Sequence, residues 1–130
     1  MGTWDESVFG NDTAADWGAN LADADDEQVV RATLELAEGG DFLGASDGMK
    51  VLAAAEVVAA AGGRPLVANA YSEEVLAWAA ARPGLAELAP LAVRAVVRVV
   101  GDGSELRELW EEVGASDWVA TVQDLLGRLQ

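Results

Sequence analysis

The sequence predicts an all-α protein, a single domain over residues 1–130 that forms a bundle of six or seven short helices. Apolar residues recur at spacings of three and four, as on one face of a helix, rather than in strand-like alternation. Glycine or proline interrupts these segments roughly every 12 to 20 residues, which fits short helices with short connections. Ala, Val and Leu dominate a hydrophobic fraction of 52%, which suits helices that pack closely through small side chains.

Residues 1–10 show no sustained helical period although they contain several large apolar side chains. We expect an ordered non-helical segment that folds back onto the bundle, with Trp4 inward and Phe9 as a further anchor. The alternative is that Trp4 is an exposed anchor for a partner protein. We favour the inward placement because an exposed tryptophan without a partner is an aggregation liability.

The first helix is predicted over residues 12–22. Asn11, Asp12 and Thr13 are adjacent N-cap candidates, and Thr13 with Asp16 three residues later resembles a capping box. Trp17 lies on the apolar stripe of this helix, so we expect it in the core.

The second and third helices follow with clear end signals. Asp25 is the expected N-cap of the second helix, with Gln28 as its reciprocal capping partner, and two glycines at 39–40 end it. The third helix is expected from Ser46 or Asp47 to about residue 61. It is apolar nearly all round, which is typical of a central, buried helix.

Four more helices complete the prediction. The fourth begins after Ser72 and ends near residue 82, ahead of a Pro-Gly pair. Pro90 fits the first position of the fifth, and Ser104 and Ser116 are the expected caps of the sixth and seventh. The predicted buried stripes are Val93, Val96, Val97 and Val100 in the fifth helix, Leu106, Leu109, Trp110 and Val113 in the sixth, and Trp118, Val122, Leu125, Leu126 and Leu129 in the seventh.

Glu56 is the one charged residue between positions 51 and 63. A carboxylate in the middle of an apolar helix needs a partner, because the burial of an unpaired charge costs on the order of several kcal/mol. Arg94 or Arg98 on the fifth helix is the expected partner, in an ion pair that fixes how two central helices align. The alternative is a catalytic or ligand-binding acid with a shifted pKa.

The net charge of −15, from 8 basic and 23 acidic residues, restricts the partners. It argues against nucleic acid and anionic membranes, and it would attract a basic protein. The absence of cysteine and histidine excludes disulfides, thiolate nucleophiles, the Ser-His-Asp arrangement and most zinc sites. No signal peptide or membrane span is recognisable, so we expect a cytoplasmic protein.

Asp5, Asp12 and Asp16 are the weak candidates for a divalent-metal site, because carboxylate oxygens suit Ca²⁺ or Mg²⁺. No stretch matches the twelve-residue calcium loop, however, and helix capping plus a solvated acidic face explains these residues better. We therefore expect no cofactor.

Three pieces of sequence stand out together. They are MGTW with FGNDTAADW shortly after it, the alanine-rich LAAAEVVAAAGGRP, and GDGSELRELWEEVG followed by SDWVATVQDLLGRL. They span nearly the whole chain, and their order resembles that of one bacterial family, the domain of unknown function numbered 4259. The resemblance implies a small bacterial cytoplasmic protein, and it brings no established activity or catalytic residues.

The leading hypothesis is a non-enzymatic acidic interaction module that binds a basic protein partner, as an inhibitor, an immunity-type protein or an adaptor does. One alternative is a carboxylate-based metal binder or enzyme that uses Asp5, Asp12, Asp16 or Glu56. A weaker alternative is a nucleic-acid mimic. The oligomeric state stays open between a monomer and a weak dimer.

Overall fold

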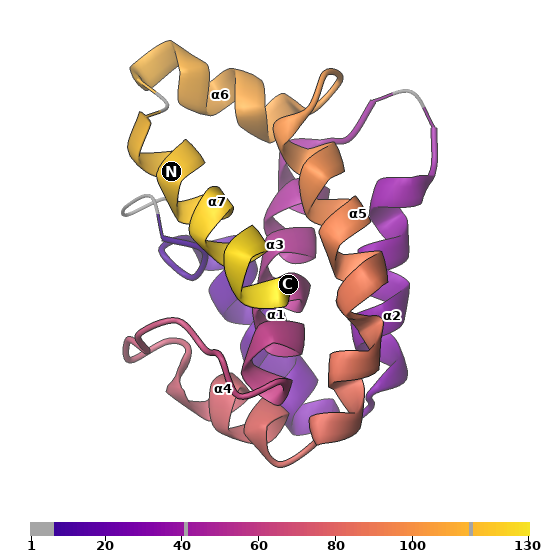
Figure 1. The fold of residues 1–130 in the computed structure, drawn as a ribbon. Coiled ribbons are helices and arrows are strands. Elements are labelled where there is room, and N and C mark those ends of the chain that lie inside the picture. The colour runs from indigo at the N-terminus through magenta and orange to yellow at the C-terminus, as the bar shows by residue number, and fades with distance from the viewer. Residues whose placement is uncertain (1–6, 41, 115) are drawn as a thin grey trace.

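Helices form every regular element of residues 7–40, 42–114 and 116–130, which are the residues described in this computed structural model (Figure 1). Among pairs of described residues, an isolated bridge joins Leu43 and Ser104. The predicted all-α class is therefore confirmed. In chain order the elements are α1 (Asp12–Ala24), α2 (Gln28–Glu35), the 3-10 helix η1 (Leu36–Glu38), α3 (Ala45–Ala61), α4 (Glu73–Ala80), the 3-10 helix η2 (Pro83–Leu88), α5 (Ala89–Val100), α6 (Glu105–Val113) and α7 (Ser116–Leu129).

Helix α3 is the centre of the bundle, as its composition predicts. It packs against all six other α-helices, with α7 crossing in front of it and α5 beside it in Figure 1. Every residue from 51 to 61 is buried. Seven of these eleven are alanine or glutamate rather than large apolar residues, and the alanines let neighbouring backbones approach closely. At Gly48 an added Cβ would lie 3.3 Å from Leu106 Cβ, so α6 also depends on a small residue here.

The described part of the N-terminal segment packs onto the bundle. Val8 and Phe9 are buried, and a Cβ added to Gly18 would lie 3.4 Å from Phe9 Cε1 and 3.1 Å from Val75 Cγ1. Phe9 therefore contacts α1 at the point where α1 meets α4. The expected inward placement of Trp4 concerns a residue outside the described part of the chain.

Asn11 begins α1, and the capping box expected at Thr13 is wrong. The Asn11 side chain accepts a hydrogen bond from the Ala14 amide at 2.8 Å and donates one to the Val8 carbonyl at 3.1 Å. One buried amide thus satisfies the helix start and also ties down the segment before it. The Thr13 hydroxyl does not cap α1, because Thr13 already lies inside the helix.

Asp25 ends α1 instead of capping α2, which corrects the second predicted cap. It adopts a left-handed conformation with φ of 54°, and α1 runs two residues further than expected. Its carboxylate accepts hydrogen bonds from Trp78 Nε1 at 2.8 Å and from Arg82, whose guanidinium also lies over the Trp78 ring. These contacts join the end of α1 to α4, and a long-range partner of this kind leaves no local sequence signal.

Asp25→Asn is expected to lower the melting temperature at neutral pH. The hydrogen bond from Trp78 and the charge of Arg82 lower the pKa of Asp25, so its charged form stabilises the fold above the ordinary carboxyl range. That contribution is lost as the pH falls through the lowered pKa, and the difference between the variant and the parent should shrink in acid. Melting curves across pH test this, with Asp23→Asn as the exposed control that should change little.

The third and fourth helix starts also differ from the expected caps. Neither Ser46 nor Asp47 caps α3, because the helix begins two or three residues earlier than expected, after Gly44. The amide of Ala45 donates to Glu105 Oε1 at 2.7 Å, so a side chain of α6 satisfies the start of α3. Ser72 does precede α4 as expected, but its hydroxyl accepts from the Asn69 amide instead of from the helix.

The buried stripe of α5 is displaced from the one expected. Its buried residues are Leu91, Ala92, Ala95, Val96 and Val99. Of the four valines predicted to be inside, only Val96 is buried, while Val97 is exposed. Ala92 and Ala95 face the core, where small side chains allow close packing, and Val93 and Val100 lie half-buried at the margins. Of the five residues expected inside in α7, Trp118, Val122, Leu125 and Leu129 are buried, and Leu126 is half-buried.

Among the described helices, none has the length and apolar character needed to cross a membrane.

Candidate interaction surface on α6

The weak candidates for a metal site do not come together in the described residues. Asp12 and Asp16 are both exposed on α1, and Asp5 lies outside the described part of the chain. Within residues 7–40, 42–114 and 116–130, no three acidic side chains converge as metal ligands.

Glu56 is fully buried, but its partner is Arg128 of α7 and not Arg94 or Arg98 as expected. The pair is bidentate: Nη1 and Nη2 of Arg128 donate to Oε1 and Oε2 of Glu56 at 2.7 and 2.8 Å. Arg128 also donates to Asp124 and to the carbonyl of Arg64. Each buried donor and acceptor atom of the pair has a hydrogen-bond partner. This supports a structural role of Glu56 over a catalytic one.

Both arginines expected to reach Glu56 lie elsewhere because the face of α5 that carries them is turned away from α3. Arg94 is exposed and forms a loose pair with Glu38 at 3.6 Å. Arg98 donates to the carbonyl of Asp102 at 3.0 Å. Burial raises the pKa of Glu56, while the hydrogen bonds and charge of Arg128 oppose that rise, and the pairing raises the pKa of Arg128.

Trp17 is buried as predicted, and its indole Nε1 donates to the hydroxyl of Thr33 at 3.1 Å. Thr33 in turn donates to the carbonyl of Val29. Trp17 therefore joins α1 to α2, and its role is structural.

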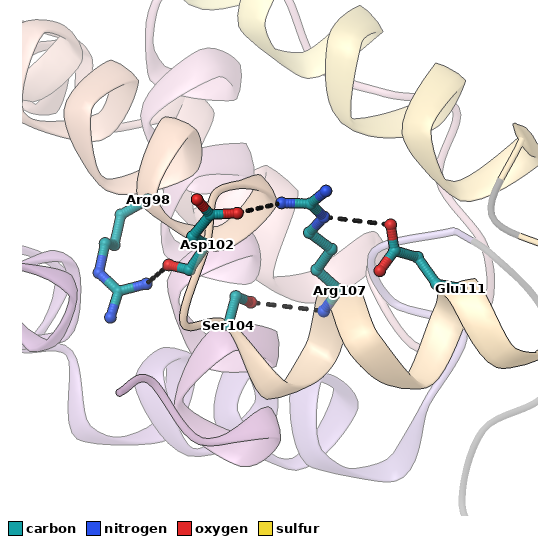
Figure 2. Close-up of polar contacts among 5 residues, drawn as sticks. All are labelled: Arg98, Asp102, Ser104, Arg107 and Glu111. Carbon is teal, nitrogen blue, oxygen red and sulfur yellow. Dashed lines mark hydrogen bonds and ion pairs between the residues drawn. The ribbon is translucent and has the colours of Figure 1, made fainter. Parts of the chain in front are cut away.

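The start of α6 is firmly anchored. The Leu43 amide donates to the Gly103 carbonyl at 2.8 Å, and the Glu105 amide donates to the Leu43 carbonyl at 2.9 Å. Ser104 caps the helix as predicted, with its hydroxyl accepting from the Arg107 amide (Figure 2). With Leu106 buried against Gly48, the first turn of α6 is fixed to the bundle.

Arg107 is the only basic residue of α6, and acidic neighbours neutralise it. Figure 2 shows its guanidinium between Asp102, at 3.0 Å, and Glu111, at 3.3 Å. Arg98 approaches the same loop from α5 through the Asp102 carbonyl. The remaining carboxylates of α6 consequently have no basic neighbour on their own helix.

The rest of α6 presents apolar side chains to solvent, which corrects the buried stripe expected there. Only Leu106 is buried, whereas 45% of Leu109 and 74% of Val113 are exposed. Trp110 is half-buried, with its ring stacked on that of Trp118 at a centroid distance of 6.3 Å. With Met49 of α3, Leu106, Leu109, Trp110 and Val113 line a shallow hollow of about 130 Å³.

Exposed carboxylates lie on the same helix as this apolar area and at the start of α7. Glu108, Glu111, Glu112 and Asp117 are all exposed. Residues 102–117 together contain six acidic side chains and one arginine. We call Leu109, Trp110, Val113 and Met49, with these four carboxylates, the α6 surface. Sequence periodicity finds the apolar stripe correctly but places it inside, because a stripe that faces the core and one that faces solvent have the same spacing.

Comparison with known proteins adds one result. A family described as "Domain of unknown function (DUF4259)" matches residues 2–121 of the 130. No curated protein and no solved structure matches the chain. The match covers the α-helical bundle from the segment before α1 into α7, including all of α6, and the chain therefore belongs to the DUF4259 family.

Proposed function

We propose that this protein is a non-enzymatic acidic interaction module that binds a basic protein partner through the α6 surface. One observation carries the proposal: beyond its first turn, α6 leaves its apolar side chains uncovered, and the same helix carries exposed carboxylates. Exposed apolar clusters of this kind are typical of protein interaction sites.

The two parts of the α6 surface have separate roles in this proposal. Leu109 and Val113 are one helical turn apart, so they offer adjacent apolar contacts beside the half-buried Trp110. Such contacts supply most of the affinity at interfaces. The exposed carboxylates select a basic partner and speed its encounter, and the net charge of −15 extends this attraction beyond contact distance.

The partner that fits is an amphipathic segment with apolar anchors and flanking lysines or arginines. An inhibitor, an immunity-type protein or an adaptor in a bacterial cytoplasm would use the surface in this way. Binding should weaken as salt rises, because the flanking charges are exposed and therefore screened.

Val113→Ser is expected to weaken the binding of a basic amphipathic peptide by about tenfold, because it removes an exposed apolar contact of the α6 surface. The probe is a fourteen-residue helical peptide of leucine and lysine, and fluorescence polarisation at 150 mM NaCl gives its dissociation constant. Val67→Ser is the matched control, because Val67 is 94% exposed in the loop before α4 and should change nothing.

A second peptide, in which serine replaces each leucine, keeps the charge and should bind at least about tenfold more weakly. Equal affinities for the two peptides would reduce the interaction to general charge attraction and would overturn the proposal. Equal losses in the Val113 and Val67 variants would overturn it as well.

A further inference from the structure

A second hollow, of about 480 Å³, lies away from the α6 surface, between α1, the first turns of α3 and the start of α2. Its volume is within the range typical of small-molecule sites. Its polar residues include Asp16 and Asn20 of α1 and Ser46 and Lys50 of α3. Neither the family match nor the proposed function assigns a role to it.

Lys50 is the only lysine of the chain, and it is half-buried at this hollow. Within the described residues its ammonium group forms no ion pair or hydrogen bond. This is unusual in a protein with 23 carboxylates, where a cation has many possible partners. An unpaired ammonium at the wall of a hollow is a ready site for an anionic group.

Asp16 lines the same hollow from α1, and it too lacks a partner among the described residues. The two opposite charges therefore share one hollow without pairing with each other. A ligand that carries both charges satisfies both, whereas a simple anion would leave the carboxylate of Asp16 close to a second negative charge. The Asn20 amide adds hydrogen-bonding capacity beside Asp16.

Apart from Thr13, the remaining wall is apolar and consists of Trp17, Leu21, Ala24 and Val29. The indole N–H of Trp17 already donates to Thr33, so Trp17 presents only apolar surface to the hollow. An aliphatic group of the ligand would pack against these residues.

We propose that this hollow binds a small zwitterion with an aliphatic side chain, that is, an α-amino acid of about the size of leucine. Its carboxylate contacts the ammonium of Lys50, its amino group contacts Asp16, and its side chain packs on Trp17 and Val29. The site is independent of the α6 surface, so each proposal can fail without the other.

Three probes of matched shape test the proposal: L-leucine, 4-methylpentanoate, which lacks the amino group, and 3-methylbutylamine, which lacks the carboxylate. Because Lys50 is the only lysine, ¹³C-dimethylation of the full chain gives one lysine methyl signal, which keeps its charge and reports binding. Leucine should shift this signal and bind at least about tenfold more tightly than either analogue. Equal affinities of leucine and its two analogues would overturn the proposal. The absence of a shift at millimolar leucine would also overturn it, as would binding that leaves the lysine signal unmoved.

Variants provide the second test. Lys50→Met and Asp16→Asn should each weaken leucine binding by about tenfold or more, as measured by calorimetry. Arg31→Met and Asp12→Asn are the charge-matched controls, since neither residue lines the hollow, and both should bind leucine as the parent does. Val113→Ser should also leave leucine binding unchanged. Losses as large in the controls as in the two lining variants would contradict the site.

Discussion

Replacing Arg128 with methionine is expected to lower the free energy of unfolding by about 3–5 kcal/mol at pH 7.5. The substitution removes both hydrogen bonds that Glu56 receives and leaves a fully buried carboxylate without a counter-charge. Methionine keeps the apolar stem of the side chain, so most of the loss reports the missing guanidinium. Urea denaturation with matched baselines gives the difference.

This loss should become smaller as the pH falls. Burial raises the pKa of Glu56, and without Arg128 the force that opposes this rise is gone. A carboxyl group with a raised pKa in the folded state favours folding most where it is protonated, and this contribution disappears as the pH rises through the raised value. The Arg128→Met variant should therefore recover part of its stability at pH 5 relative to pH 7.5.

Two further variants distinguish a buried pair from a surface one. Arg94→Met removes an arginine that is 63% exposed and only loosely paired with Glu38, and it should cost no more than about 0.5 kcal/mol. The double variant Glu56→Met with Arg128→Met replaces both charges with apolar groups and should regain most of the stability lost by Arg128→Met alone. A loss of less than about 1 kcal/mol in Arg128→Met would refute the buried pair.

Phe9→Ala is expected to destabilise the protein by about 3–5 kcal/mol, because it removes a fully buried aromatic side chain and leaves a cavity where α1 meets α4. The size of the effect is notable because Phe9 precedes the first helix, where substitutions commonly have small effects. Thermal and urea denaturation both measure it.

Phe42→Ala is the matched control for this prediction. Phe42 lies in the connection before α3 and is 57% exposed, so the same chemical change should alter stability by no more than about 0.5 kcal/mol. Similar losses in the two variants would mean that Phe9 is not an anchor of the N-terminal segment.

The helices and the central position of α3 were predictable because they depend on local signals. Glycine and proline breaks and three-to-four periodicity are encoded within one or two turns. Residues 51–61 are the clearest case, since a helix that is apolar all round has no face to present to solvent, and all of them are buried.

The partner of Glu56 could not be predicted in the same way. Arg128 is 72 residues away, and the choice among three arginines depends on which face of α5 or α7 is turned to α3. That orientation in turn depends on Ala92 and Ala95, whose small size favours the close approach of α5. The caps by Glu105 and by Asp25 were missed for the same reason, because their contacts join distant parts of the chain.

The α6 surface shows a different limit of sequence reasoning. The stripe of Leu109, Trp110 and Val113 was found, but only the packing of α6 reveals that it lies uncovered. The apolar face of α6 is narrow, because the helix also contains Glu105, Glu108, Glu111 and Glu112. This narrow face was the available signal that α6 lies at the periphery of the bundle.

The most direct test of the proposed interaction is a methyl NMR titration with the basic amphipathic peptide. We expect shifts confined to Met49, Leu109 and Val113, which line the α6 surface, and the loss of these shifts when the peptide's leucines are replaced by serine. Val67 and Val97, which are exposed elsewhere, should not move. Shifts distributed over all exposed methyl groups, or absent from Leu109 and Val113, would contradict it.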